Sequence, residues 1–118
     1  MKRILLLTAM FLGLVTITFA QSDYYIKKAQ SFQHEAEYYQ KKAEGYRREA
    51  TYYLKKVEGY QREAAYYTKR GDIDRAKTQT RYAEEAMDKY KTQLRYAAEA
   101  DEKAAMYLRW ATEALKKH

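Results

Sequence analysis

The stretch YYQKKAEGYRREATYYLKKVEGYQREAA, residues 38–65, decides the fold because it contains two consecutive copies of one 14-residue unit. An earlier copy, YYIKKAQSFQHEAE, begins at Tyr24, and a more divergent copy, YYTKRGDIDRAKTQ, begins at Tyr66. Fourteen residues are two heptads, the repeat of a coiled coil and not the longer repeat of a helical solenoid. The unit therefore predicts a long α-helix with a coiled-coil stripe.

Two heptad positions carry the apolar stripe of this helix. A small aliphatic residue recurs at position a, and an aromatic residue recurs at position d. Position a holds Ala29, Ala36, Ala43, Ala50, Val57 and Ala64, and position d holds Tyr25, Phe32, Tyr39, Tyr46, Tyr53, Tyr60 and Tyr67.

A second series with the same 14-residue period follows, marked by Arg81-Tyr82-Ala83, Arg95-Tyr96-Ala97 and Arg109-Trp110-Ala111. Its heptads predict a second stripe. Position a would hold Ile73, Thr80, Met87, Leu94, Asp101, Leu108 and Leu115, and position d would hold Ala76, Ala83, Tyr90, Ala97, Ala104 and Ala111.

The two series meet at a sequence suited to a reversal of the chain. Gly71 can adopt the left-handed conformation that ends a helix, and Asp72 can cap the next helix. The chain contains no proline. We therefore expect an all-α fold, a long two-helix antiparallel coiled-coil hairpin with helices over about 23–70 and 74–117 and a turn at about 71–73.

An antiparallel hairpin pairs position a of one helix with position d of the other. Centring the pairing beside Ile73 matches small residues with small ones and large residues with large ones. The small pairs are Ala64 with Ala83, Ala50 with Ala97, Ala43 with Ala104 and Ala36 with Ala111, and the large pairs are Tyr60 with Met87, Tyr53 with Leu94, Tyr39 with Leu108 and Phe32 with Leu115.

Position c lies outside this seam and carries a second pattern of bulky and small residues. Glycine inside a helix costs about 1 kcal/mol against alanine, so Gly45 and Gly59 need a reason beyond propensity. One hypothesis is that tyrosines of a neighbouring molecule pack over these notches; the alternative is that duplication copied the glycines. The expected self-association ridge consists of Tyr24, Tyr38, Gly45, Tyr52, Gly59, Tyr66, Tyr82, Tyr96 and Trp110.

Residues 1–20 resemble an export signal, with Lys2 and Arg3 before an apolar stretch and a cleavage site after Ala20. An uncleaved N-terminal anchor is the alternative. No transmembrane span is predicted after cleavage, and the chain has no cysteine. We therefore expect a secreted or periplasmic protein.

The charged residues predict association with anionic partners only weakly. The 23 basic and 16 acidic residues give +7, and loss of Lys2 and Arg3 with the signal lowers this to +5. Lysines such as Lys28 and Lys42 alternate with glutamates at position g, an arrangement typical of ion pairs and not of a nucleic-acid site. No specific nucleic-acid partner is predicted.

The sequence predicts no catalytic site, cofactor or metal centre. The two histidines, His34 and His118, are far apart in sequence, and no phosphate-binding glycine loop is present. The leading expectation is an exported, non-enzymatic scaffold protein that forms homo-oligomers in the cell envelope or extracellular matrix. The alternatives are a periplasmic holdase-type chaperone or adaptor for envelope proteins, and a binder of anionic surfaces such as membranes, polysaccharides or nucleic acid.

Overall fold

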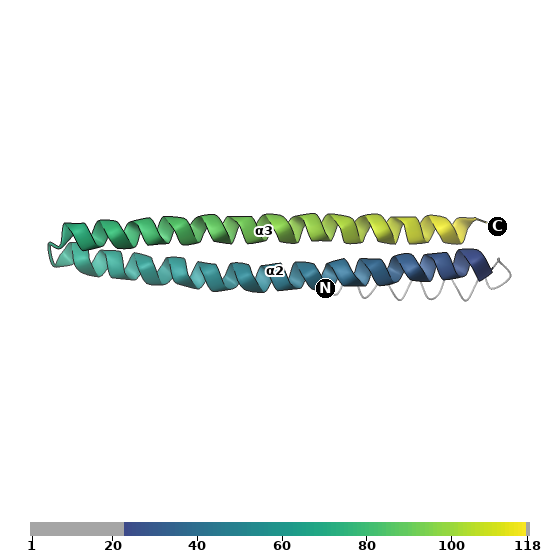
Figure 1. Ribbon diagram of the computed structural model, residues 1–118, viewed down its shortest axis with the longest axis horizontal. Helices are drawn as coiled ribbons and strands as arrows, with labels where there is room; N and C mark the ends of the chain where they lie inside the picture. Colours follow the sequence, from purple (N-terminus) through teal and green to yellow (C-terminus); the bar gives the residue numbers. More distant parts are fainter. Residues whose placement is uncertain (1–22, 118) are drawn as a thin grey trace. The chain divides into compact units, whose positions relative to one another are not determined.

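The computed structural model describes residues 23–117, and the expected export signal at 1–20 lies outside them. Helix α2 runs from Asp23 to Lys69 and helix α3 from Ile73 to Lys116. The two helices pack side by side as an antiparallel hairpin (Figure 1), which confirms the predicted fold class. Neither of them contains a window apolar enough for a membrane crossing.

Each of two compact units contains a segment of both helices. We call Lys42–Glu99 the turn unit, because it includes the connection between α2 and α3. The terminal unit comprises Met1–Lys41 with Ala100–His118, of which 23–41 and 100–117 are described.

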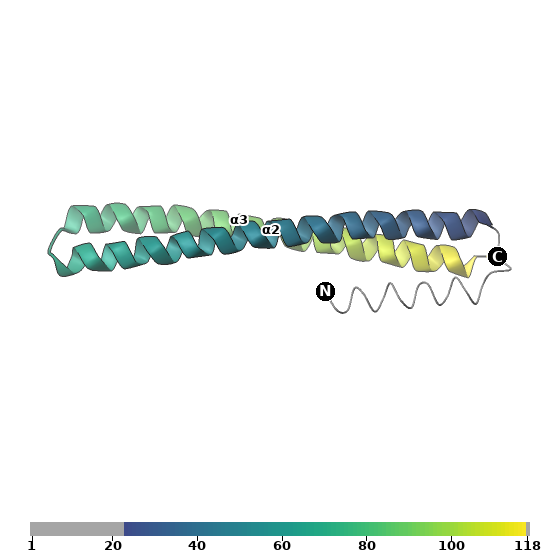
Figure 2. The ribbon, with the colours of Figure 1, turned by 90° about the horizontal axis from the view of Figure 1, so that it is seen from below.

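The chain reverses at a short connection between α2 and α3 (Figure 2), where a glycine in the left-handed conformation ends α2. Gly71 has φ of 80°, its amide donates to the carbonyl of Thr68 at 3.1 Å, and the amide of Asp72 donates to the carbonyl of Tyr67 at 2.9 Å. This pair of bonds is a Schellman motif. Asp72 then caps α3, since its Oδ1 accepts from the amide of Arg75 at 3.2 Å.

The seam of α2 consists of alanines covered by half-buried aromatic rings. The small residues at position a are at most 2% exposed from Ala29 to Val57, and the rings at position d are of intermediate exposure. Among the described residues no large side chain is fully buried. The predicted a and d stripe of α2 is therefore correct.

The seam of α3 differs from the prediction. Ile73 and Leu94, predicted at the seam, are 51% and 40% exposed. In their place Ala86, Ala100 and Ala114 are buried, three residues after the buried alanines at position d. In the turn unit α3 is thus rotated so that positions d and g, and not a and d, face α2, whereas in the terminal unit Leu115 at position a is also buried, at 4% exposed.

The register of the turn unit also differs from the predicted one. The ring of Tyr60 contacts the ring of Tyr82, and the ammonium group of Lys89 lies over the ring of Tyr53. These contacts are symmetric about residue 71, inside the turn, whereas the predicted pairing was centred beside Ile73. The short connection of Arg70, Gly71 and Asp72 is the physical reason, because it fixes which residues of the two helices are level. In the terminal unit Phe32 does pack against a cluster that includes its predicted neighbour Leu115.

Replacing Gly71 with alanine is expected to lower the free energy of unfolding by about 1–2 kcal/mol, since a Cβ disfavours the left-handed conformation. The same exchange at Gly59, inside α2, is expected to raise it by up to about 1 kcal/mol. A Cβ there meets nothing closer than 4.0 Å. Urea unfolding of dilute protein, followed by circular dichroism, measures both, and shifts of equal sign would contradict this account.

Candidate binding surface: an aromatic face with paired cations

One face of the hairpin, which we call the aromatic face, is built by rings at position d of α2 that reach across to position c of α3. In the turn unit these contacts alternate between ring and cation. The ring pairs are Tyr46–Tyr96 at 5.4 Å and Tyr60–Tyr82 at 5.5 Å; the cation contacts are Lys89 on Tyr53 and Arg75 on Tyr67, both at 5.7 Å. Each step of seven residues back along α2 matches a step of seven forward along α3.

The terminal unit follows the same rule. Phe32 contacts the indole ring of Trp110 at 5.7 Å, and the ammonium group of Lys103 lies 5.3 Å from the ring centre of Tyr39. Tyr39 also stacks on Tyr107 at 5.7 Å, with the ring planes 9° apart. Tyr107 was not predicted from the sequence, because it lies at position g, outside the predicted a and d stripe. Its contact could have been predicted only if position g had been assigned to the seam.

Tyrosines occur in adjacent pairs where α3 presents a cation. In the turn unit the rings of Tyr52 and Tyr53 are 5.2 Å apart and those of Tyr66 and Tyr67 5.3 Å apart, both edge to face. The first ring of each pair lies under a cation one helical turn later: Lys56 is 5.1 Å from Tyr52 and Arg70 is 4.7 Å from Tyr66. Each tyrosine pair thus touches one cation from each helix.

The environment of Lys56 favours its charged form. A hydrogen bond with the side chain of Tyr52 raises the pKa of Lys56 above its ordinary value of 10.5. Because the pKa is raised on folding, the contact stabilises the fold below about pH 10.5, and this contribution is lost as the pH rises through the raised pKa. Lys56 is therefore fully charged at neutral pH.

We define two cation–tyrosine sites in the turn unit, which share an architecture of two rings and two cations. One consists of Tyr52, Tyr53, Lys56 and Lys89, and the other of Tyr66, Tyr67, Arg70 and Arg75. Their first members are 14 residues apart, about 21 Å along a helix. Since a tyrosine ring is neutral, these contacts do not cancel the charges of Lys56, Arg70 and Lys89. Arg75 differs, because its Nε also lies 3.4 Å from Oδ2 of Asp72 in an ion pair.

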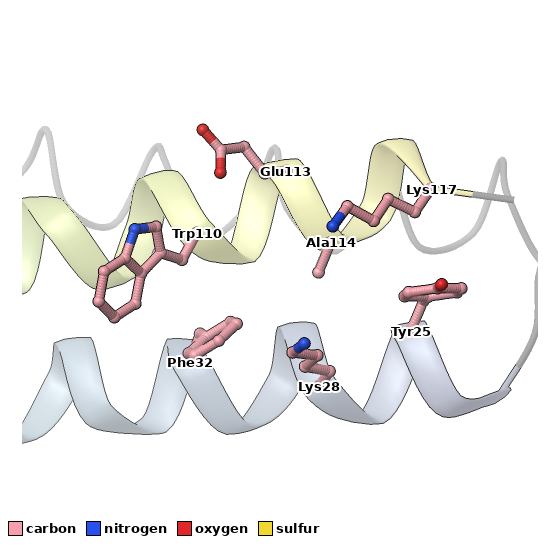
Figure 3. A pocket seen from close by; sticks show the side chains of 7 residues that line it. All are labelled: Tyr25, Lys28, Phe32, Trp110, Glu113, Ala114 and Lys117. Atoms are coloured by element: carbon pink, nitrogen blue, oxygen red, sulfur yellow. The ribbon is translucent and has the colours of Figure 1, made fainter.

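The terminal unit has an open pocket on its aromatic side, with a volume of about 160 Å³. Figure 3 shows the rings of Phe32 and Tyr25 directed from α2 toward α3, while the carboxylate of Glu113 points away from α2. Lys28 and Lys117 also line it. The pocket combines apolar rings with cations, as the cation–tyrosine sites do.

The residues of the predicted ridge are all accessible, but their contacts differ between the helices. Tyr24, Tyr38, Tyr52 and Tyr66 of α2 are between 48% and 62% exposed. Tyr82, Tyr96 and Trp110 of α3 are 38–39% exposed and contact rings of α2. The α3 residues therefore serve the packing of the hairpin as well as its surface.

The glycines of the ridge are not required by packing inside the hairpin. A Cβ built at Gly45 or Gly59 would meet only the end of an arginine side chain, Arg48 or Arg62, at 4.0 Å. This is ordinary van der Waals contact. Alanine would fit at both positions. Packing within one molecule therefore does not explain why glycine, with its lower helix propensity, is present there.

No cluster of three or more metal-ligating side chains occurs within residues 23–117. His34 lies 3.9 Å from Glu37 on an exposed part of α2. Comparison of the chain with protein-family models, curated proteins and solved structures gave no match. The surfaces of the hairpin are therefore the basis for a proposed function.

The pairing of Tyr60 with Tyr82 is testable by a double-mutant cycle. Replacement of both residues by leucine, singly and together, is expected to give a coupling free energy of about 0.5–1.5 kcal/mol, as for other aromatic pairs. A matched cycle for Tyr60 and Met87, using Met87→Ala, is expected to give less than about 0.5 kcal/mol. A larger coupling free energy for Tyr60 and Met87 than for Tyr60 and Tyr82 would instead support the register predicted from the sequence.

Proposed function

We propose that this protein is an exported, non-enzymatic scaffold whose helical hairpins associate with one another through the row of tyrosines and glycines on α2. Export is inferred from the signal-like residues 1–20. The association is inferred from the turn unit, where Tyr52 and Tyr66 alternate with Gly45 and Gly59 at intervals of seven residues. The main observation behind the proposal is the pair of glycines, because packing inside the hairpin does not require glycine at either position.

The exposed tyrosines supply the attractive part of such an interface. Tyr52 is 51% exposed and Tyr66 is 48% exposed, and each is held by an edge-to-face neighbour and a cation. A ring that is already fixed loses little conformational entropy when a partner covers it. Rigid, half-exposed tyrosines are therefore suited to binding another protein surface.

The glycines allow the close approach of a neighbouring helix. A helix surface approaches another most closely where side chains are absent, and Gly45 and Gly59 each lie one heptad from a tyrosine. A ring of a neighbouring hairpin over such a notch would recover the roughly 1 kcal/mol that each glycine costs the helix. Intermolecular packing thus accounts for residues that intramolecular packing does not.

The variant Gly45→Ala/Gly59→Ala separates assembly from folding. Its hairpin is expected to be more stable in dilute solution, while its association weakens, because two methyl groups fill the notches. Sedimentation velocity at tens of micromolar is expected to show a lower average mass than for the unmodified protein. Thr51→Ala is the control, since it raises helix propensity at an exposed position outside the row. An unchanged mass for the glycine variant would disprove the proposed interface.

The cation–tyrosine sites favour a second candidate function, the binding of acidic polysaccharide. Lys56 and Lys89 touch neutral rings, so their charge remains available to an anion. Nucleic acid fits less well: duplex DNA has one charge per ~1.7 Å, which would bring phosphates against Glu49 and Glu63, about 10 Å along the helix from Lys56. The widely spaced cations of the cation–tyrosine sites match a polysaccharide with widely spaced negative charges, whose sugar rings can stack on the tyrosines.

Retention on immobilised hyaluronate, a sparsely charged acidic polysaccharide with one carboxylate per disaccharide, tests this second function. Lys56→Gln/Lys89→Gln is expected to elute at clearly lower salt than the unmodified protein, because both cations of one site are lost. The control, Lys55→Gln/Lys69→Gln, removes the same charge from the outer position f of α2 and is expected to shift elution less. Equal shifts would mean that net charge alone governs retention.

A further inference from the structure

The turn unit has a second exposed apolar surface, which the aromatic contacts do not use. We call it the aliphatic face. Rotation of α3 leaves Leu94 and Ile73 outside the seam, 40% and 51% exposed. Leu94 follows Met87 by one heptad, and Ile73 precedes Thr80 by one heptad, so these four residues form one row along α3.

An open groove of about 340 Å³ lies in the aliphatic face beside this row. It is lined chiefly by Val57 and Ala64 of α2 and by Thr80, Ala83 and Met87 of α3. Among the described residues lining it, Glu84 is the only ionisable one. The groove has no side chain of this hairpin that fills it, whereas the exposed Leu94 lies about 10 Å beyond its Met87 end. One face thus carries both a protruding apolar side chain and a hollow.

Charges beside the row repeat with the same spacing. Lys91 follows Glu84 by one heptad and lies on the same stripe of α3. Consider two α3 helices packed antiparallel about a two-fold axis that crosses them between Met87 and Asp88. Glu84 of each copy is then level with Lys91 of the other. Leu94 is level with residue 81, within the Thr80–Met87 span of the groove.

We propose that the aliphatic face is the site at which a second copy of this chain docks, antiparallel and with two-fold symmetry. Leu94 of each copy enters the groove of the other, and Glu84 and Lys91 form two reciprocal ion pairs. A two-fold interface needs such self-complementarity, because every contact occurs twice. This inference rests on the proposed self-association and adds a second surface to it, distinct from the row of tyrosines and glycines.

Charge exchange tests the reciprocal pairs in protein purified from an exporting host. Glu84→Lys and Lys91→Glu each place like charges together at two points of the interface, so each is expected to weaken dimerisation about tenfold. The double variant restores opposite charges and is expected to return to within about threefold of the original affinity. Leu94→Ala, which removes the docked side chain, is expected to weaken dimerisation about tenfold or more.

Sedimentation equilibrium measures the dimerisation affinity of the unmodified protein and of each variant. Circular dichroism verifies that each variant is helical. Glu85→Lys is the control, because it makes the same charge change on another side of α3. Weakened single variants with a restored double variant would support the two-fold interface. Association that none of the changes affects would overturn this interface while leaving the proposed function intact. A double variant that stays weak would also overturn it, because Glu84 and Lys91 would then not pair with each other across the interface. A protein that is monomeric throughout would overturn both.

Discussion

The structure depends on one steric constraint: the helices pair along alanines, so larger side chains must cover the seam from outside it. Ala36 and Ala111 are fully buried, yet the described residues include no fully buried large side chain. The rings at position d of α2 provide the cover by lying across to position c of α3. Their intermediate exposure suits tyrosine, which is apolar in its body and polar at its tip.

This covering explains why the two faces of the hairpin differ. Rings that extend toward position c draw that side of α3 toward α2, so in the turn unit positions d and g become the seam and Ile73 and Leu94, at position a, are left outside it. Aromatic and cationic groups therefore collect on one face, while Leu94 and Ile73 are exposed on the other. The alternation of ring and cation at position c follows the 14-residue period, because α3 presents a cation where α2 carries a tyrosine pair.

The sequence was sufficient for the helices, the turn and the stripe of α2, because these rest on local signals: the heptads, Gly71 and Asp72. It misassigned part of the seam of α3, because positions a, d and g all carry apolar or small residues in several of its heptads. Choosing the bulkier Ile73 and Leu94 over Ala86 and Ala100 follows hydrophobicity, but a seam covered by rings selects small residues. The turn contained the missing information, since a connection of three residues, 70–72, centres the pairing near Gly71 and not beside Ile73.

The glycines and the exposed aliphatic side chains bear on function for the same reason. A single hairpin would be more stable with alanine at Gly45 and Gly59, and more soluble with a polar residue at Leu94. Residues that are unfavourable for one molecule are explained when a second molecule uses them. Because the two sets lie on different faces, one can join two hairpins while the other stays open. A protein with two such surfaces can form assemblies larger than a dimer. A scaffold requires this, whereas a protein that only dimerises needs a single surface.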